Sequence, residues 1–210
     1  MIENYEKQIQ KICSILEDSL KTYQDVIPIK YYNPVIIKSG INEFNGNKYY
    51  LETASVSGIN NITDYENIEY SSRPSRANMQ PISSSVWFAR MKGSNKKIII
   101  TDLDKDLINQ YIFSTGFLGL SVQSNDFLTF FTAIIISNSF DVKRDLLATG
   151  ATQESINNEK FLEIKVPFLT NNQIKEYGKK YSTFVYELSL LRNKINRLKK
   201  SKKILLDKYF

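Results

Sequence analysis

The sequence predicts an α+β fold, in which a β-rich body lies between a short N-terminal helix and a much longer C-terminal one. Apolar residues recur at heptad spacing at both ends of the 210-residue chain, a pattern typical of helices that pack against other helices. Between them, from about Val26 to Ser121, runs rich in Tyr, Val, Ile and Trp alternate with Gly and Pro, as in short strands. We therefore expect three parts, with bounds at 1–23, 24–169 and 170–210.

The first 22 residues follow a helical pattern. One heptad series consists of Ile2, Ile9, Leu16 and Tyr23, and a second contains Tyr5 and Ile12. This apolar strip predicts a short helix that packs along part of the C-terminal helix.

The middle of the chain is predicted to hold short strands and two helical segments. The candidate strands are Val35–Lys38, Lys48–Ser55, Ile68–Ser71, Ser85–Met91, Lys97–Thr101, Phe117–Val122 and Phe161–Val166. The apolar run 125–137 is expected to be a buried helix that begins at Ser124 or Asn125, although its Ile run also fits a strand. Residues 140–149 are predicted to be helical and to end at Gly150.

The last 37 residues carry a strict heptad pattern. Thr170 and Gln173 fit a capping box at the start of this helix, just after Pro167. A seven-residue repeat kept over about five heptads favours a helix roughly 55 Å long that projects and pairs with another helix. Lys202 is the one charged residue of the seam. The predicted partner interface contains Ile174, Tyr177, Tyr181, Phe184, Leu188, Leu191, Ile195, Leu198 and Leu205.

The net charge of +6 is concentrated in this helix. Residues 171–210 hold eleven Lys and Arg against three Asp and Glu, whereas the rest of the chain holds 17 against 19. The surplus fits a solvated helix face, or attraction to phosphate or to an acidic protein partner.

Composition also excludes several kinds of chemistry. The chain has no histidine, which removes the commonest general base and the usual Ser/His and Cys/His nucleophile pairs. Its one cysteine, Cys13, excludes an intrachain disulfide and suits a reducing cytoplasm. No apolar run approaches membrane-spanning length. We expect this chain to hold neither a cofactor nor a metal.

The segment from Tyr70 to Lys97 is the predicted recognition surface. A loop that contains Pro74 and ends at Pro81 presents side chains that can make two hydrogen bonds to a base edge, and the hairpin after it presents cations suited to phosphates. The base-edge candidates are Arg73, Arg76, Asn78 and Gln80, and the phosphate candidates are Arg90, Lys92, Lys96 and Lys97. The alternative is a polar loop whose Arg residues pair with carboxylates.

Two other functions stay open from the residues alone. Glu163 and Lys165 on one strand, with Asp141 or Asp145, resemble the pattern of a metal-dependent nuclease, although alternating charge on an exposed strand produces the same spacing. A coiled-coil adaptor without a DNA role would also carry the C-terminal heptads.

Several motifs together resemble the DNA-specificity (S) subunit of Type I restriction–modification systems. The first is a G-x-T-Q-x-x-I segment, which is followed by a strand, a proline and a long helix that a glutamine initiates. In this sequence the motifs are Gly150–Asn157, Phe161–Pro167 and Gln173, with further similarity at Ser114–Phe117, Tyr49–Val56 and Ser72–Met91. The resemblance covers roughly residues 25–210.

This resemblance implies a fold and a function. The fold would be a target recognition domain, similar to the specificity domain of Taq-type adenine methyltransferases, attached to a conserved spacer helix. The function would be non-catalytic sequence-specific DNA binding, which adds Thr152 and Gln153 to the candidate DNA-binding residues. Methyltransferase subunits, with S-adenosylmethionine, and possibly restriction subunits would be the partners. A full S subunit has two such domains, so one domain implies a homodimer that reads a bipartite site.

Overall fold

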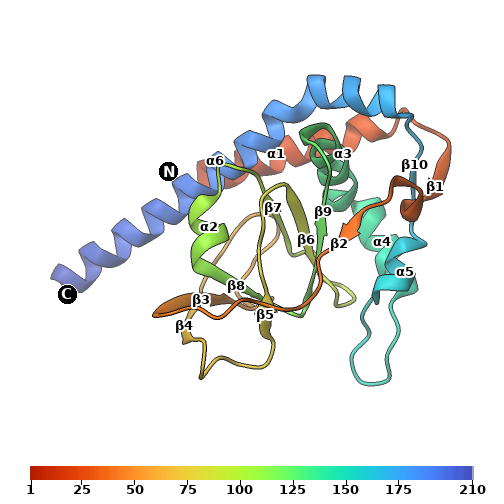
Figure 1. Cartoon of the computed structure of the whole chain (residues 1–210). Coiled ribbons are helices and arrows are strands. Elements are labelled where there is room, and N and C mark those ends of the chain that lie inside the picture. Colours follow the sequence, from red (N-terminus) through yellow and green to blue (C-terminus); the bar gives the residue numbers. More distant parts are fainter. Residues whose placement is uncertain (210) are drawn as a thin grey trace.

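The structure is a computed structural model that describes residues 1–209, apart from the side chain of Asp207. It confirms the α+β class, with a β-rich body along one side of which the long helices α1 and α6 run (Figure 1). The helices are α1 (Ile2–Leu20), a 3-10 turn η1 (Ile29–Tyr32), α2 (Lys105–Gln110), α3 (Asn125–Ile136), α4 (Asn138–Leu147), α5 (Asn158–Leu162) and α6 (Asn171–Tyr209). The strands are β1 (Val26–Pro28), β2 (Val35–Ile36), β3 (Asn47–Leu51), β4 (Glu66–Glu69), β5 (Ala77–Met79), β6 (Ser85–Ala89), β7 (Lys97–Ile100), β8 (Tyr111–Ser114), β9 (Phe117–Ser121) and β10 (Lys165–Pro167).

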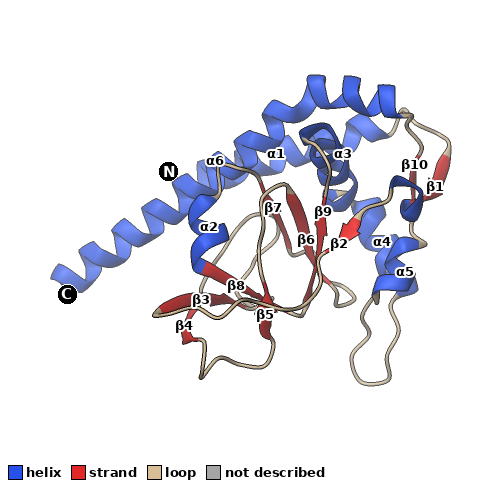
Figure 2. Cartoon of the chain, in the orientation of Figure 1, coloured by secondary structure: helices blue, strands red, loops and turns tan. Residues whose placement is uncertain are grey.

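Two four-stranded sheets form the body (Figure 2). One has the strand order β2-β9-β6-β7 and is antiparallel throughout, and the other has the order β4-β3-β8-β5 with a parallel β3–β8 pair. Strand β6 is buried on both faces because its side chains alternate between two cores. Val86 and Phe88 pack toward the helices, whereas Trp87 packs toward the second sheet, with its ring 5.1 Å from that of Phe113.

The local signals for α3 and α6 are confirmed. The Ser124 side chain accepts a hydrogen bond from the amide of Phe127 at the start of α3. At α6, Gln173 N donates to Thr170 Oγ1 (3.3 Å), and Thr170 N donates to Gln173 Oε1 (2.8 Å). These reciprocal bonds are the predicted capping box, so the first helical residues are fixed by their own sequence.

The prediction for 161–166 is wrong in part. Residues 158–162 are helical, because Asn157 caps a short helix through a hydrogen bond from Lys160 N to Asn157 Oδ1 (2.8 Å). The strand occupies only 165–167, where it pairs with β1. Helix α2 and strands β1, β5 and β8 were not predicted.

The prediction that α6 projects along its whole length is also wrong. Its first two thirds lie against α1 and α3 in one hydrophobic core (Figure 1). Gly178 allows this close packing, since a Cβ there would lie 2.7 Å from Cα of Asp126. Five predicted interface residues are thus buried inside the chain's own core: Ile174, Tyr177, Leu188, Leu191 and Ile195. Tyr181 and Phe184 are half-buried against the same core.

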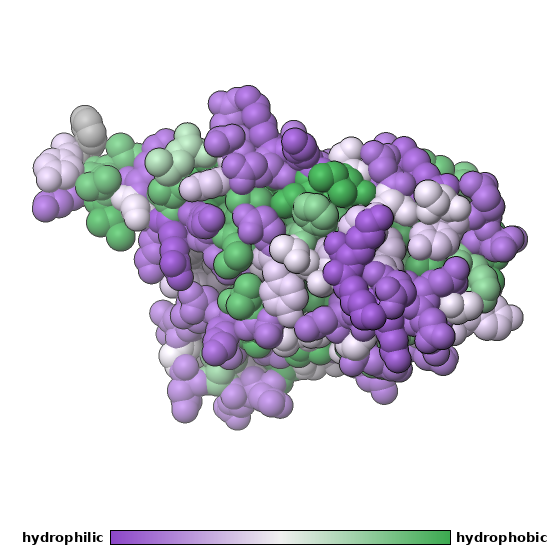
Figure 3. Space-filling model, turned by 90° about the horizontal axis from the view of Figure 1, so that it is seen from above, coloured by the Kyte–Doolittle hydropathy of each residue, from purple (hydrophilic) through white to green (hydrophobic). Residues whose placement is uncertain are grey.

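Only the end of α6 projects freely. Lys199 Nζ still bonds to Asn61 Oδ1 (2.7 Å) and to Ile62 O (2.9 Å) on the body. Beyond it, Leu205 is 56% exposed, as are its neighbours Ile204 and Leu206 to a similar degree. Viewed from the α6 side, hydrophobic surface is visible near this projecting end (Figure 3). The heptad seam therefore has an intrachain part and a short free part, with Leu198 between them.

Candidate nucleic-acid interface

The predicted loop between Pro74 and Pro81 contains a strand. Residues 77–79 form β5, which pairs with β8 at one edge of its sheet. Its ends are fixed by main-chain hydrogen bonds, from Thr115 N to Arg76 O (2.9 Å) and from Gly40 N to Asn78 O (2.8 Å). The segment is therefore held in a defined conformation before any ligand binds.

Arg73 and Arg76, which lie on either side of Pro74 in the sequence, differ in their partners. Arg73 Nη1 donates to Tyr70 O (2.6 Å), and its guanidinium carbon lies 4.0 Å from the centre of the Tyr70 ring. Arg76 is exposed, and none of the ion pairs found within residues 1–209 includes it. Arg76 therefore has the freer guanidinium of the two.

The two amide candidates, Asn78 and Gln80, have different surroundings. Asn78 is half-buried in β5. Gln80 Nε2 donates to Ile108 O (2.8 Å) and to Pro81 O (3.1 Å), so both amide hydrogens are used within the chain. The two-bond contact with adenine that we predicted for Gln80 would have to replace one of these bonds, because that contact needs one of the amide hydrogens.

Main-chain hydrogen bonds connect four sequence segments in a row. Thr115 N donates to Arg76 O, Arg90 N donates to Gly116 O (2.9 Å), and Ile156 N donates to Arg90 O (3.0 Å). The β4–β5 connection, the β8–β9 turn, the end of β6 and the loop before α5 are thereby joined. The β4–β5 connection and the loop before α5 lie at the edge of the molecule away from α6 (Figure 1).

The cations after β6 are largely engaged within the chain. Arg90 donates to Phe117 O, Ile156 O and Asn158 Oδ1, at distances of 2.9 to 3.3 Å, and burial lowers its pKa. Lys92 Nζ pairs with Glu154 Oε2 (2.6 Å), and both side chains are close to half exposed. Lys96 is half-buried. These contacts make Arg90 a bridge between β6, β9 and α5.

The prediction that Lys97 contacts a phosphate is wrong. Its residue is only 1% exposed, because it lies within β7 opposite Phe88 and faces the start of α4. Its amine pairs with Asp141 Oδ2 at 2.7 Å, and burial lowers its pKa. A short Lys-Lys run before an apolar strand looks like a hairpin tip in sequence, but its second lysine is part of the core.

Thr152 and Gln153 lie on the exposed loop before α5, beside the end of β6. Gln153 Nε2 is 3.5 Å from Met91 Sδ, and Lys92 N donates to Glu154 O (3.0 Å). The structure thus brings these two residues and Lys92 together, as the predicted surface requires. Sequence reasoning assigned no role to Gly116, which the fold places beside Arg76, or to Gly40, which bonds to Asn78.

The carboxylates of the alternative nuclease pattern are each paired with a cation. Glu163 Oε1 lies 2.8 Å from Lys30 Nζ, and Asp141 contacts Lys97 and Arg144. Asp145 also pairs with Arg144 (2.7 Å). Within the described residues, no group of three or more His, Cys, Asp or Glu side chains is arranged to hold a metal ion.

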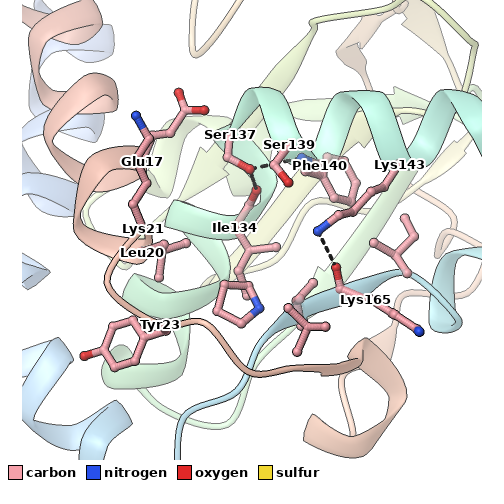
Figure 4. Close-up of a pocket in the computed structure, with 14 residues that line it drawn as sticks. Glu17, Leu20, Lys21, Tyr23, Ile134, Ser137, Ser139, Phe140, Lys143 and Lys165 are labelled. Atoms are coloured by element: carbon pink, nitrogen blue, oxygen red, sulfur yellow. Dashed lines mark hydrogen bonds between the residues drawn. The ribbon is translucent and has the colours of Figure 1, made fainter.

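A cavity of about 220 Å³ lies elsewhere, between the end of α1, the α3–α4 junction and β10 (Figure 4). Ser137 and Lys143, two of its polar residues, are bonded within the chain. Ser137 Oγ donates to Ile134 O (2.7 Å) and accepts from Phe140 N (3.1 Å), and Lys143 Nζ donates to Lys165 O (2.8 Å). The polar side chains at this cavity therefore serve to join α3, α4 and β10. No helix within residues 1–209 is long and apolar enough to cross a membrane.

Comparison with known proteins identifies the fold through structure alone. No family model matches the sequence, and no curated protein matches it significantly. Among solved structures, the S subunit of a Type I restriction–modification system from M. genitalium is similar over 99% of this chain and 53% of its own length, with a TM-score of 0.54 and 13% identity. The HsdS subunit from Thermoanaerobacter tengcongensis is similar over 86% of this chain and 47% of its own, with a TM-score of 0.53 and 15% identity. The chain therefore has the fold of about half of a Type I restriction–modification S subunit.

Proposed function

We propose that this chain is a non-catalytic, sequence-specific DNA-binding subunit that directs a Type I methyltransferase complex, and any restriction subunits that join it, to a bipartite target. The observation that carries the proposal is the fold, which matches half of an S subunit over nearly the whole chain. The polar and basic segments joined at the edge away from α6 support the same conclusion, since they are suited to base edges and phosphates.

The three predicted parts then have separate roles. Residues 24–169 read the DNA, and 170–210 set the position of this reading unit in the complex, with 1–23 packed along the same helix. Arg192 on α6 pairs with Asp104 on the body (2.6 Å), and both side chains are fully buried. Such a buried pair fixes α6 on the reading unit, so that the direction of the helix relative to that unit is constant.

A second copy of the chain is the proposed partner of the free end of α6. Helix α1 covers α6 only as far as its own N-terminus, where Lys194 Nζ lies 5.7 Å from the centre of the Tyr5 ring. Beyond that point the apolar residues 204–206 have no cover within the described chain. Two such ends packed about a two-fold axis would cover each other and place two identical readers on one palindromic duplex.

The test starts from purified chain and a library of duplexes with a randomised centre. The chain should enrich one sequence motif, and its affinity should fall steeply as salt increases, because phosphate contacts release counterions. It should also co-purify with a Type I methyltransferase subunit from the same cells and change which sites that subunit methylates. A chain that enriches no motif and leaves methylation sites unchanged would refute the proposal.

Within this proposal, Arg76→Ala should weaken binding to the selected motif by about 5- to 150-fold while binding to a scrambled duplex changes little. Arg73→Ala should have a smaller effect on discrimination, because its guanidinium is already bonded to Tyr70. Equilibrium titrations with both duplexes, at matched salt, measure the difference. An equal loss on both duplexes would mean that these residues contact phosphates only.

A further inference from the structure

The turn between β8 and β9 contains a glycine whose missing side chain leaves space for an arginine. A Cβ built on Gly116 would lie 2.9 Å from Nη2 of Arg76, 3.1 Å from Cγ2 of Thr53 and 3.4 Å from Oγ of Ser114. The first distance is closer than real Cβ atoms approach. The guanidinium of Arg76 therefore occupies space that any larger residue at position 116 would fill.

The backbone of Arg76 is held on this turn while the charge of its side chain stays accessible. Its carbonyl accepts hydrogen bonds from Thr115 N and from Asn78 N, both at 2.9 Å, so its backbone is fixed on two sides. Its residue is exposed and takes part in no ion pair within residues 1–209. An arginine with a fixed backbone and no carboxylate partner keeps its guanidinium donors for a ligand.

The inference rests on the proposed function. We propose that Gly116 is a positioning residue for base recognition, because its lack of a Cβ sets the orientation in which Arg76 reads one guanine of the target. Arginine matches guanine best, since its planar fork donates to O6 and N7 together in the major groove. That contact depends on orientation, so a displaced guanidinium loses discrimination but keeps its charge.

We expect alanine at position 116 to leave the fold intact, with a shift of the Arg76 side chain and a small adjustment of Thr53. Gly116 is not among the residues with positive φ, and the atom closest to a Cβ added there is the tip of a flexible side chain. Its own main-chain bonds, from Arg90 N to Gly116 O and from Gly116 N to Ser114 Oγ, do not depend on the absence of a Cβ. Gly119 differs, because a Cβ there would lie 2.6 Å from the buried Trp87 ring.

The experiment compares Gly116→Ala, Arg76→Ala and the double variant. Each full-length protein selects duplexes from the randomised library, and each is then titrated with the wild-type motif and with a scrambled duplex. Thr115→Ala is the matched control, since it alters the same turn but leaves position 116 open. Thermal melting of every variant checks that it folds.

We expect Gly116→Ala to lose preference at the same base pair as Arg76→Ala, by at least about tenfold, with scrambled-duplex affinity within about twofold of wild type. The double variant should lose no more than Arg76→Ala alone, because both changes remove one contact. Thr115→Ala should keep the preference.

Other outcomes separate this inference from the proposed function. If wild type enriches a motif and Gly116→Ala keeps it while Arg76→Ala loses it, the positioning role is wrong and the function stands. If wild type enriches no motif, the proposed function itself fails. If Gly116→Ala melts far below wild type, the Arg76→Lys variant tests the inference instead. Lysine keeps the charge of arginine but not its planar fork. A lysine variant that retains the guanine preference would overturn the inference.

Discussion

At the scale of single residues, a fully buried ion pair joins α6 to the body. Arg192 Nη1 also donates to Asn60 Oδ1 and to Ile99 O, both at 2.6 Å, and Asp104 Oδ2 accepts from Thr101 N (2.8 Å). Burial alone would raise the pKa of Asp104, but the charge and hydrogen bonds of Arg192 outweigh it and hold this pKa below its ordinary value.

This pair predicts how stability depends on pH. A carboxyl whose pKa is lowered on folding contributes stability above its unfolded pKa of about 3.9, and the contribution is lost as pH falls through the folded value. Asp104→Asn should lower the free energy of unfolding at pH 7 by about 3–5 kcal/mol, since it leaves Arg192 buried and unpaired. It should also flatten the acid side of the stability curve. Asp102→Asn, at an exposed neighbour, is the control for urea unfolding between pH 3 and 7.

At the scale of elements, the sequence predicted what local chemistry determines. The capping box and the heptads located α6, and Ser124 located α3, because caps and apolar periodicity act over a few residues. Strand β8 was missed because its identity depends on a parallel partner, β3, about sixty residues earlier in the chain. A heptad pattern also does not identify the helix that packs against it. In this chain, α1 and α3 pack against most of α6.

Two leucines of one heptad series test this division of α6. Leu191 is fully buried and Leu205 is 56% exposed, although both occupy the same seam position. Leu191→Ala should lower the free energy of unfolding by about 2–5 kcal/mol, whereas Leu205→Ala should change it by less than about 0.5 kcal/mol at low protein concentration. Urea titrations below the concentration at which copies associate measure both. Equal losses would mean that the free end of α6 also folds back on the body.

At the scale of the whole molecule, the proposed reading loops and the proposed assembly surface lie on opposite sides. The loops that carry Arg76 and Gln153 lie at the edge away from α6, and the uncovered apolar residues lie at the free end of that helix (Figure 1). The positive surplus of residues 171–210 limits how closely two such ends approach, so their association should strengthen with salt while DNA binding weakens. Opposite effects of salt on DNA binding and on self-association would distinguish the DNA-reading surface from the free end of α6 in one protein.

The proposed pairing of copies predicts the result of one matched pair of double variants. Leu205→Asp with Leu206→Asp should make the chain monomeric, because it places charge in the seam that two free ends share. Val142→Asp with Leu146→Asp makes the same change on α4, where both residues are also exposed (59% and 79%), and should leave the dimer intact. Sedimentation equilibrium in about 0.5 M salt, where charge repulsion is screened, measures the association of both variants and of wild type. A wild-type chain that stays monomeric at the highest concentrations would contradict the pairing, and so would a dimer that survives the change on α6. Loss of the dimer in both variants would point to general repulsion between the copies rather than to this seam.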